Sequence, residues 1–158
     1  MASTLKNLSE FSTEGLVDIH DKTFAILVSE WNTEVTEALY HGAVATLLAH
    51  GASEAKLIRK NVPGSYELTL AAQWMAQRRE IDAVICLGCV IQGETRHFDF
   101  ICQAVAIGIT EVSLKYNKPV IFGVLTPDNQ QQAIDRAGGK HGNKGDEAAM
   151  AAIKMLSF

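Results

Sequence analysis

The feature of this sequence that most constrains its fold is a regular alternation of short apolar runs with longer stretches of helical periodicity. A continuous apolar run of four to eight residues is typical of a strand buried on both faces of a sheet. Strands that alternate with helices in this way predict a parallel sheet covered by helices on both sides. The sequence therefore predicts an α/β three-layer sandwich around a four-stranded parallel sheet. We expect the strands, all of them buried, at residues 24–29, 56–62, 83–87 and 119–125.

The segments between these runs predict the helices. The first helix opens at Thr33 and is stopped by Gly51, and a Gly/Lys-rich link over residues 140–145 precedes a final alanine-rich helix. Residues 1–20 show no clean period, so we expect an N-terminal arm that is loose or laid against a partner. No repeat or linker is visible, and residues 1–158 are expected to form a single domain. The other helices are expected at about residues 68–75, 98–116 and 129–137.

Composition and charge exclude several classes of protein. A net charge of −4 and the lack of any basic run argue against nucleic-acid binding. No apolar stretch approaches membrane-spanning length and no signal-peptide core is visible, so we expect a cytoplasmic protein with no membrane partner. Cys86 and Cys89 have a C-x-x-C spacing, but no second Cys/His pair completes a zinc site. We therefore expect these two residues and Cys102 to be buried free thiols.

Ligands of such sheets bind beyond the carboxyl ends of the strands, which makes the residues following each strand the candidate site. Trp31 follows the first strand, where it is either a core aromatic or a stacking surface for a flat heterocycle. Glu67 comes shortly after the second strand. It is either a first-turn carboxylate favoured by the helix dipole or a ligand for hydroxyl groups.

The third strand leads into a glycine turn and then into a helix. Free backbone N–H groups at Gly93, Glu94 and Thr95 could hold an anion, although this turn is no known phosphate-binding motif. His97 stands at the start of the helix. It could merely cap that helix, but we favour a general acid/base suited to neutral pH.

Three other candidates have plain structural alternatives. Phe122 lies within a strand, so that core packing is the stronger interpretation. Arg136 and Lys144 flank glycines and would usually be solvated charges, but a phosphate site needs cations and few others are near this edge.

Five segments, in their order and spacing, resemble those of lumazine synthases, and the resemblance covers essentially the whole chain from Phe24 onward. They are residues 63–67 (Pro-Gly-Ser-Tyr-Glu), 88–98 (Gly-Cys-Val-Ile-Gln-Gly-Glu-Thr-Arg-His-Phe), 119–126 (Pro-Val-Ile-Phe-Gly-Val-Leu-Thr), 132–138 (Gln-Ala-Ile-Asp-Arg-Ala-Gly) and 142–145 (Gly-Asn-Lys-Gly).

The resemblance implies a transferase of riboflavin biosynthesis. It would condense 5-amino-6-(D-ribitylamino)uracil with 3,4-dihydroxy-2-butanone 4-phosphate to give 6,7-dimethyl-8-ribityllumazine, phosphate and water. It also implies a flavodoxin-like fold, no metal or organic cofactor, and homopentamers that in some members form decamers or sixty-subunit icosahedral capsids. The active site would be shared between adjacent subunits, and riboflavin synthase is a candidate partner.

Carried onto this chain, the resemblance implies a role for each candidate residue. His97 would transfer protons, and Trp31 would stack on the pyrimidine ring with Asn32 nearby. The ribityl chain and ring edge would be held by Ser65, Tyr66 and Glu67, together with backbone groups of Cys89, Val90 and Ile91. The phosphate would bind to the N–H groups of Glu94 and Thr95 and to Arg136, and the neighbouring subunit would supply Phe122, Arg136 and Lys144.

The sequence departs from the family pattern at few positions. Position 31 is Trp where many members have Phe, while Gly139 and His141 stand where Thr and Ala are common. A receiver-type regulatory domain is excluded because strand three ends in Gly88 and Cys89 rather than in a phosphoacceptor. A non-catalytic flavin- or lumazine-binding or shell-forming homologue stays open as the alternative, and the presence of His97 with Arg136 argues against it.

Overall fold

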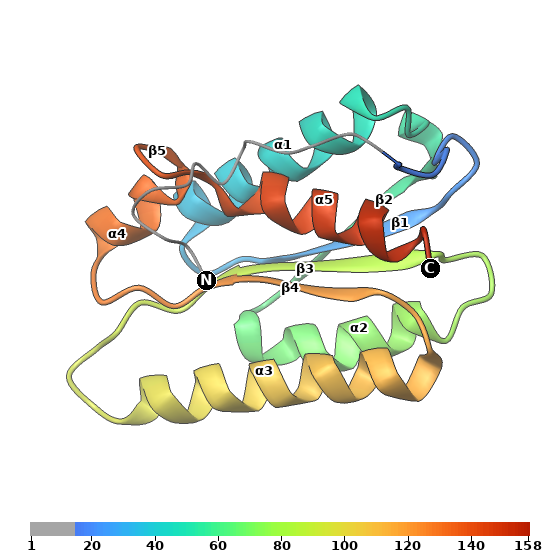
Figure 1. Cartoon of the computed structure of the whole chain (residues 1–158). Coiled ribbons are helices and arrows are strands. Elements are labelled where there is room, and N and C mark those ends of the chain that lie inside the picture. Colours follow the sequence, from blue (N-terminus) through green and yellow to red (C-terminus); the bar gives the residue numbers. More distant parts are fainter. Residues whose placement is uncertain (1–14) are drawn as a thin grey trace.

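The computed structural model describes residues 15–158 and shows a parallel sheet between two layers of helices (Figure 1). The order of its four strands is β2-β1-β3-β4, and all neighbouring pairs are parallel. The predicted flavodoxin-like α/β sandwich is therefore confirmed. The strands are β1 (Phe24–Ser29), β2 (Leu57–Val62), β3 (Ala83–Cys89) and β4 (Val120–Leu125).

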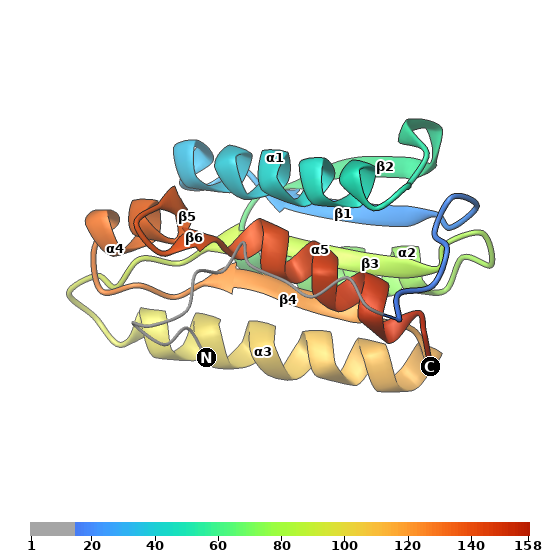
Figure 2. The same cartoon turned by 45° about the horizontal axis from the view of Figure 1, so that its top comes forward.

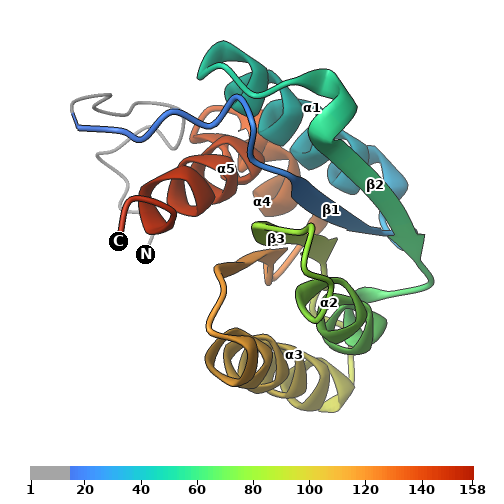
Figure 3. The same cartoon turned by 90° about the vertical axis from the view of Figure 1, so that its right-hand side faces the viewer.

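The helices cover the sheet in two pairs, as the end-on view shows (Figure 3). Helices α1 and α5 lie on one face, and α2 and α3 lie on the other (Figures 1 and 3). Turning the molecule brings α1 and α5 forward as neighbours over the sheet (Figure 2). The helices are α1 (Thr33–Ala49), α2 (Leu68–Ala76), α3 (His97–Tyr116), α4 (Gln130–Asp135) and α5 (Lys144–Met155), with 3₁₀ turns at Glu54–Lys56 and Ser65–Glu67.

The central strands divide their side chains between two cores. Ile26 and Ile85 point toward α1 and α5, whereas Leu27 and Cys86 point toward α2 and α3. All four are fully buried. A strand with helices on both faces needs apolar residues at every position, which explains the continuous runs in the sequence.

The expectation that all four strands are buried is wrong for β2. Only Val62 of its six residues is buried, and Lys60 and Asn61 are exposed. Among residues 15–158 this strand is at the edge of the sheet and pairs only with β1. Charged side chains on an edge strand are a common protection against pairing with another chain.

Helix α4 is shorter than the helix expected at about residues 129–137, since it ends at Asp135. A short antiparallel hairpin follows, formed by β5 (Ala137–Gly139) and β6 (Gly142–Asn143). Gly138 and Gly142 have φ angles of 106° and 81°, which L side chains rarely adopt. The glycines that the sequence indicated as a link therefore build this hairpin.

Part of the expected N-terminal arm packs on the core of its own chain. Ile19 is fully buried in the core beneath α1 and α5, and Leu16 and Val17 pack against that core. The rest of the arm, residues 1–14, lies outside the described residues.

Helix α3 contradicts the expectation that no apolar stretch approaches membrane-spanning length. It has 20 residues and a mean hydropathy of 1.2, so that by length and composition alone it could cross a membrane. One such helix is weak support for a membrane span, because core helices satisfy the same criteria. Here Val105, Ile109 and Val112 are buried against the sheet, although only 17% of the most apolar 18-residue window of the helix is buried.

Candidate active site

A cavity of about 590 Å³ opens at the carboxyl edge of the sheet, where α1 and α3 begin. This volume is within the usual range for small-molecule sites. Nine of the residues predicted for the site line the cavity, and Gly64 and Ile101 complete its wall. The nine are Trp31, Asn32, Ser65, Tyr66, Glu67, Cys89, Val90, Ile91 and His97.

Trp31 and Asn32 form the turn between β1 and α1. The Trp31 side chain is 73% exposed although it lines the cavity, so it is no core aromatic. Asn32 adopts the left-handed conformation, with φ 59° and ψ 48°. Its side-chain amide donates a 2.9 Å hydrogen bond to the carbonyl oxygen of Cys89, at the end of β3.

Ser65 contributes a buried hydroxyl group to the cavity wall. The residue is only 5% exposed, and its Oγ has no hydrogen-bond partner among the described residues. The hydroxyl of fully buried Ser29 is likewise unpartnered. A β-carbon on Gly88 would lie 2.5 Å from the Ser65 Oγ and 3.3 Å from the Ser29 Oγ. Glycine at position 88 therefore leaves room for both hydroxyl groups, of which only that of Ser65 belongs to a cavity-lining residue.

Tyr66 and Glu67 are exposed on the wall formed by the 3₁₀ turn after β2. Gly64 precedes this turn, and a β-carbon there would lie 3.1 Å from Glu67 Oε2 and 3.4 Å from Trp31 Cδ1. Gly64 thus lets the carboxylate and the indole ring approach the backbone closely. The Tyr66 hydroxyl, the Glu67 carboxylate and the Ser65 hydroxyl suit a ligand rich in hydroxyl groups.

The end of β3 supplies mainly backbone to the cavity. Burial raises the pKa of the Cys89 thiol to about 12, with a smaller contribution from Cys102, so that Cys89 is a neutral thiol at pH 7 and not a nucleophile. The Cys89 carbonyl accepts from Asn32, and the Val90 N–H donates to the Leu125 carbonyl at 2.9 Å. Two of the backbone groups expected to contact a ligand are therefore already engaged. Among the expected buried thiols, Cys102 differs because it is only half-buried.

His97 is the first residue of α3, and its exposed imidazole lines the cavity. Its backbone N–H lies 3.4 Å from the Thr95 Oγ, which closes the preceding turn. Ile101, one helical turn further on, lines the same cavity, as expected for residues four apart on one helix face. That spacing is the sequence feature that could have identified Ile101. Glu94 and Thr95 are exposed on the turn beside the cavity but do not line it.

Besides Glu94 and Thr95, three further predicted site residues do not line this cavity within one chain. Phe122 lies on β4 and packs against the core under α2 and α3. Arg136 follows α4, and its guanidinium donates to the Gln132 carbonyl at 3.1 Å. Lys144 forms a 2.6 Å ion pair with Glu147 at the start of α5. Of the described residues that line the cavity, His97 alone has a basic side chain.

The fold and the cavity together define a class of protein. It is an α/β protein of flavodoxin-like architecture whose carboxyl-edge site offers an exposed indole ring, buried and exposed hydroxyl groups and an imidazole. Comparison with known proteins identifies the family within that class. The chain belongs to the 6,7-dimethyl-8-ribityllumazine synthase family, whose sequence model matches residues 21–158.

Relatives that carry this name are similar over essentially their entire length. The protein of Cytophaga hutchinsonii is 66% identical over 157 residues, covering 99% of this chain and 98% of the relative. The protein of Parabacteroides distasonis is 51% identical over 158 residues, covering 100% and 99%. That of Porphyromonas gingivalis is 50% identical over 158 residues, covering 100% and 98%.

Proposed function

We propose that this chain catalyses the penultimate step of riboflavin biosynthesis. It condenses 5-amino-6-(D-ribitylamino)uracil with 3,4-dihydroxy-2-butanone 4-phosphate to give 6,7-dimethyl-8-ribityllumazine and phosphate. The observation that carries the proposal is the carboxyl-edge cavity, where Trp31, Ser65 and His97 come together in a chain of this family. A planar ring stacks on the indole of Trp31, and the ribityl hydroxyl groups meet the polar wall of residues 65–67.

The reaction needs proton transfer and positioning rather than a protein nucleophile. The substrate amine attacks the ketone and forms an imine with loss of water. Elimination then releases phosphate, and the second nitrogen closes the ring with loss of another water. Each of these steps moves protons between nitrogen, carbon and oxygen atoms, which His97 serves as general acid and base. The cavity contributes further by holding both reactants in one orientation.

We propose that the phosphate is bound at the turn before α3 and by a second copy of the chain. The exposed turn of Glu94 and Thr95 leads into the N-terminus of α3, which favours an anion. No arginine or lysine of the described residues lines the cavity, which supports a cation supplied by a neighbour to pair with the phosphate. Arg136 of the adjacent subunit takes this role, with Phe122 and Lys144 of the same neighbour.

A homo-oligomer built from pentamers follows from the same proposal, with a capsid as its larger form. Exposed apolar residues of α2 and α3 support such an assembly, because a face of this kind is usually covered. Phe100, Ile107 and Leu114 are spaced by seven and share one face of α3, while Leu70 and Trp74 are four apart on α2. The protein works in the cytoplasm, and riboflavin synthase is the candidate partner that takes up its product.

The proposal is tested by mixing the purified protein with both substrates and following lumazine formation by absorbance. We expect a rate far above the uncatalysed condensation, with release of one phosphate for each lumazine. A rate equal to the uncatalysed one, from protein that binds the lumazine product, would instead establish the non-catalytic binding or shell-forming homologue.

A further inference from the structure

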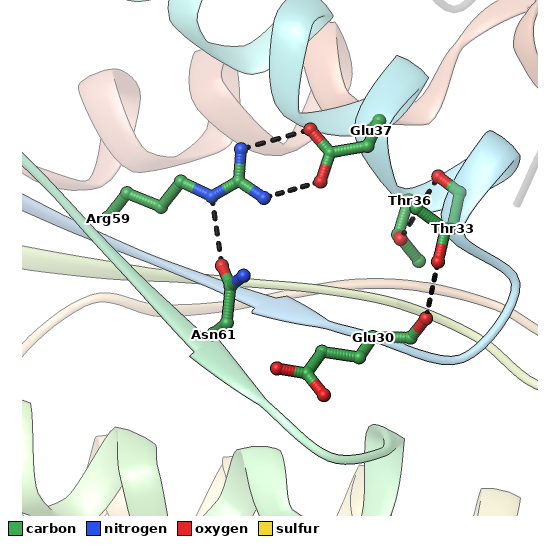
Figure 4. A network of polar contacts seen from close by, with 6 residues as sticks. All are labelled: Glu30, Thr33, Thr36, Glu37, Arg59 and Asn61. Atoms are coloured by element: carbon green, nitrogen blue, oxygen red, sulfur yellow. Dashed lines mark hydrogen bonds and ion pairs between the residues drawn. The ribbon is translucent and has the colours of Figure 1, made fainter.

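The turn that carries Trp31 is anchored at three points, to both strands beside β1 and to itself. The Glu30 N–H donates to the Val62 carbonyl of β2 at 2.9 Å. The Thr33 hydroxyl donates to the Glu30 carbonyl at 2.7 Å and closes the turn (Figure 4). Asn32 completes the anchoring with its 2.9 Å hydrogen bond to the Cys89 carbonyl of β3.

Asn32 combines two properties that few residues offer together. Its φ of 59° lies in the left-handed region, which asparagine tolerates better than other side chains apart from glycine. Its backbone carbonyl accepts the first hydrogen bonds of α1, from Val35 and Thr36. Its side chain does not cap that helix but reaches across to β3, 57 residues away in the sequence. The residue thus fixes the direction of the chain and also ties the turn to the cavity floor.

This arrangement bears most on the position of the neighbouring Trp31 indole. Trp31 is 73% exposed, so that packing restrains its side chain only weakly. A β-carbon added at Gly64 would lie 3.4 Å from Cδ1, so that one edge of the indole lies close to Gly64. An exposed side chain that must become ordered when a ligand binds reduces the affinity, and prior ordering removes this cost.

We propose that Asn32 is a positioning residue that holds Trp31 as an ordered stacking platform before the ligand arrives. The ligand class, a planar heteroaromatic ring, rests on the proposed function, whereas the ordering of the platform does not. Asn32 acts through Trp31 and the Cys89 carbonyl rather than by contact with the ring. In the ligand-free protein the indole therefore moves less than its exposure would predict.

The test separates the hydrogen bond from the backbone conformation. Asn32→Gly keeps the left-handed turn but loses the bond to Cys89, and Asn32→Asp keeps the shape but places a carboxylate against the carbonyl oxygen. Asn117→Gly is the matched control, because Asn117 also has a positive φ of 50° but lies at the far end of α3. All variants also carry Trp74→Phe, so that Trp31 is the one tryptophan left of the two in the sequence.

The first readout is time-resolved fluorescence anisotropy of Trp31 without ligand, and the second is calorimetric affinity for 6,7-dimethyl-8-ribityllumazine. The calorimetry is repeated with Trp74 intact, so that a loss caused by the background is recognised. We expect faster local motion of the indole and about fivefold or greater loss of affinity in both Asn32 variants. Asn117→Gly stays within twofold of its parent, about the scatter of such a measurement.

Unchanged indole motion in both Asn32 variants would overturn the proposal, and an affinity loss without faster motion would identify Asn32 as a direct ligand contact instead. A different outcome concerns the function alone. The parent protein could bind no lumazine while the indole still moves faster in Asn32→Gly. That result would support the positioning role of Asn32 and contradict the proposed function.

Discussion

At the scale of single residues, the chemistry of this chain depends on groups that the fold leaves available. His97 is exposed at the start of α3, and the buried Ser65 hydroxyl has no hydrogen-bond partner in the described part of the chain. Both were predictable as residues of the carboxyl edge because they follow strand ends. The hydrogen bonds that occupy the Cys89 carbonyl and the Val90 N–H were not predictable. Hydrogen bonds between residues far apart in sequence leave no local pattern.

Substitution of His97 by alanine should slow the reaction without abolishing it. We expect kcat to fall about 10²-fold, because general acid/base catalysis contributes on this order while positioning remains. The KM values of both substrates should change little. Steady-state absorbance kinetics measure the effect, with Arg96→Ala as the control on the adjacent exposed residue. A His97→Ala enzyme with unchanged kcat would refute the proton-transfer role.

Replacement of Ser65 by alanine should weaken binding of the aminouracil substrate without loss of stability. The hydroxyl has no partner to lose among residues 15–158, whereas a hydrogen bond to the ligand is worth about 1 kcal/mol, or about fivefold in KM. Ser29→Ala is the matched control, because Ser29 is equally buried and unpartnered but does not line the cavity. Equal KM increases in both variants, measured with the same assay, would contradict this role of Ser65.

At the scale of elements, the sequence predicts buried strands better than a strand at the edge of the sheet. The central strands β1 and β3 were readily found because every one of their residues is buried. The edge strand β2 was misjudged because the order of strands in a sheet leaves no local sequence pattern, and Lys60 and Asn61 are exposed at this edge. The β5–β6 hairpin was missed because five residues, three of them glycines, carry too little side-chain information.

Arg59 joins the edge strand to α1. Its guanidinium pairs with the Glu37 carboxylate through two nitrogens and donates a hydrogen bond to Asn61 (Figure 4). The guanidinium carbon also lies 4.3 Å from the centre of the Tyr40 ring. The hydrogen bond from Arg59 lowers the pKa of Glu37 below its usual 4.5, with Coulombic attraction adding to the effect. A lowered pKa in the folded state means that the pair stabilises the protein above the pKa of the unfolded carboxyl. That contribution disappears as the pH falls through the folded-state value.

A double-mutant cycle of Glu37→Gln and Arg59→Gln should give a coupling energy of about 0.5–1 kcal/mol at pH 7, since both side chains are partly exposed. The coupling should vanish at a pH below the lowered pKa of Glu37. Thermal unfolding at fixed protein concentration measures both values. A coupling that is the same at pH 7 and in acid would show that the contact does not depend on the charge of Glu37.

At the scale of the whole molecule, the two helical layers differ in what they expose. The α2 and α3 layer carries several exposed apolar residues and a groove of about 340 Å³ between the two helices. The sequence predicts the length of α3 but not which of its apolar residues stay exposed. The assembly proposed above makes this face a candidate subunit interface.

Introducing charge into this face should therefore break the assembly. We expect Phe100→Glu or Leu114→Glu to shift the protein toward smaller species in analytical ultracentrifugation, because a buried unpaired carboxylate is costly. Leu48→Glu, on α1 in the opposite layer and 40% exposed, is the control and should leave the size unchanged. Retention of full size by both α3 variants would show that this face is not the interface.

The central claim is that one subunit provides the cavity with His97 while its neighbour provides Arg136. It is tested by co-expressing His97→Ala and Arg136→Ala chains with different affinity tags, isolating the mixed oligomer and measuring lumazine formation at low butanone phosphate. Each variant alone should be slow, Arg136→Ala mainly through a higher KM for the phosphate substrate. Random mixing of equal amounts leaves about a quarter of shared sites with both residues intact, so activity should rise to about a quarter of the wild-type rate. Activity of the mixed oligomer no higher than the mean of the two variants would contradict a site shared between subunits.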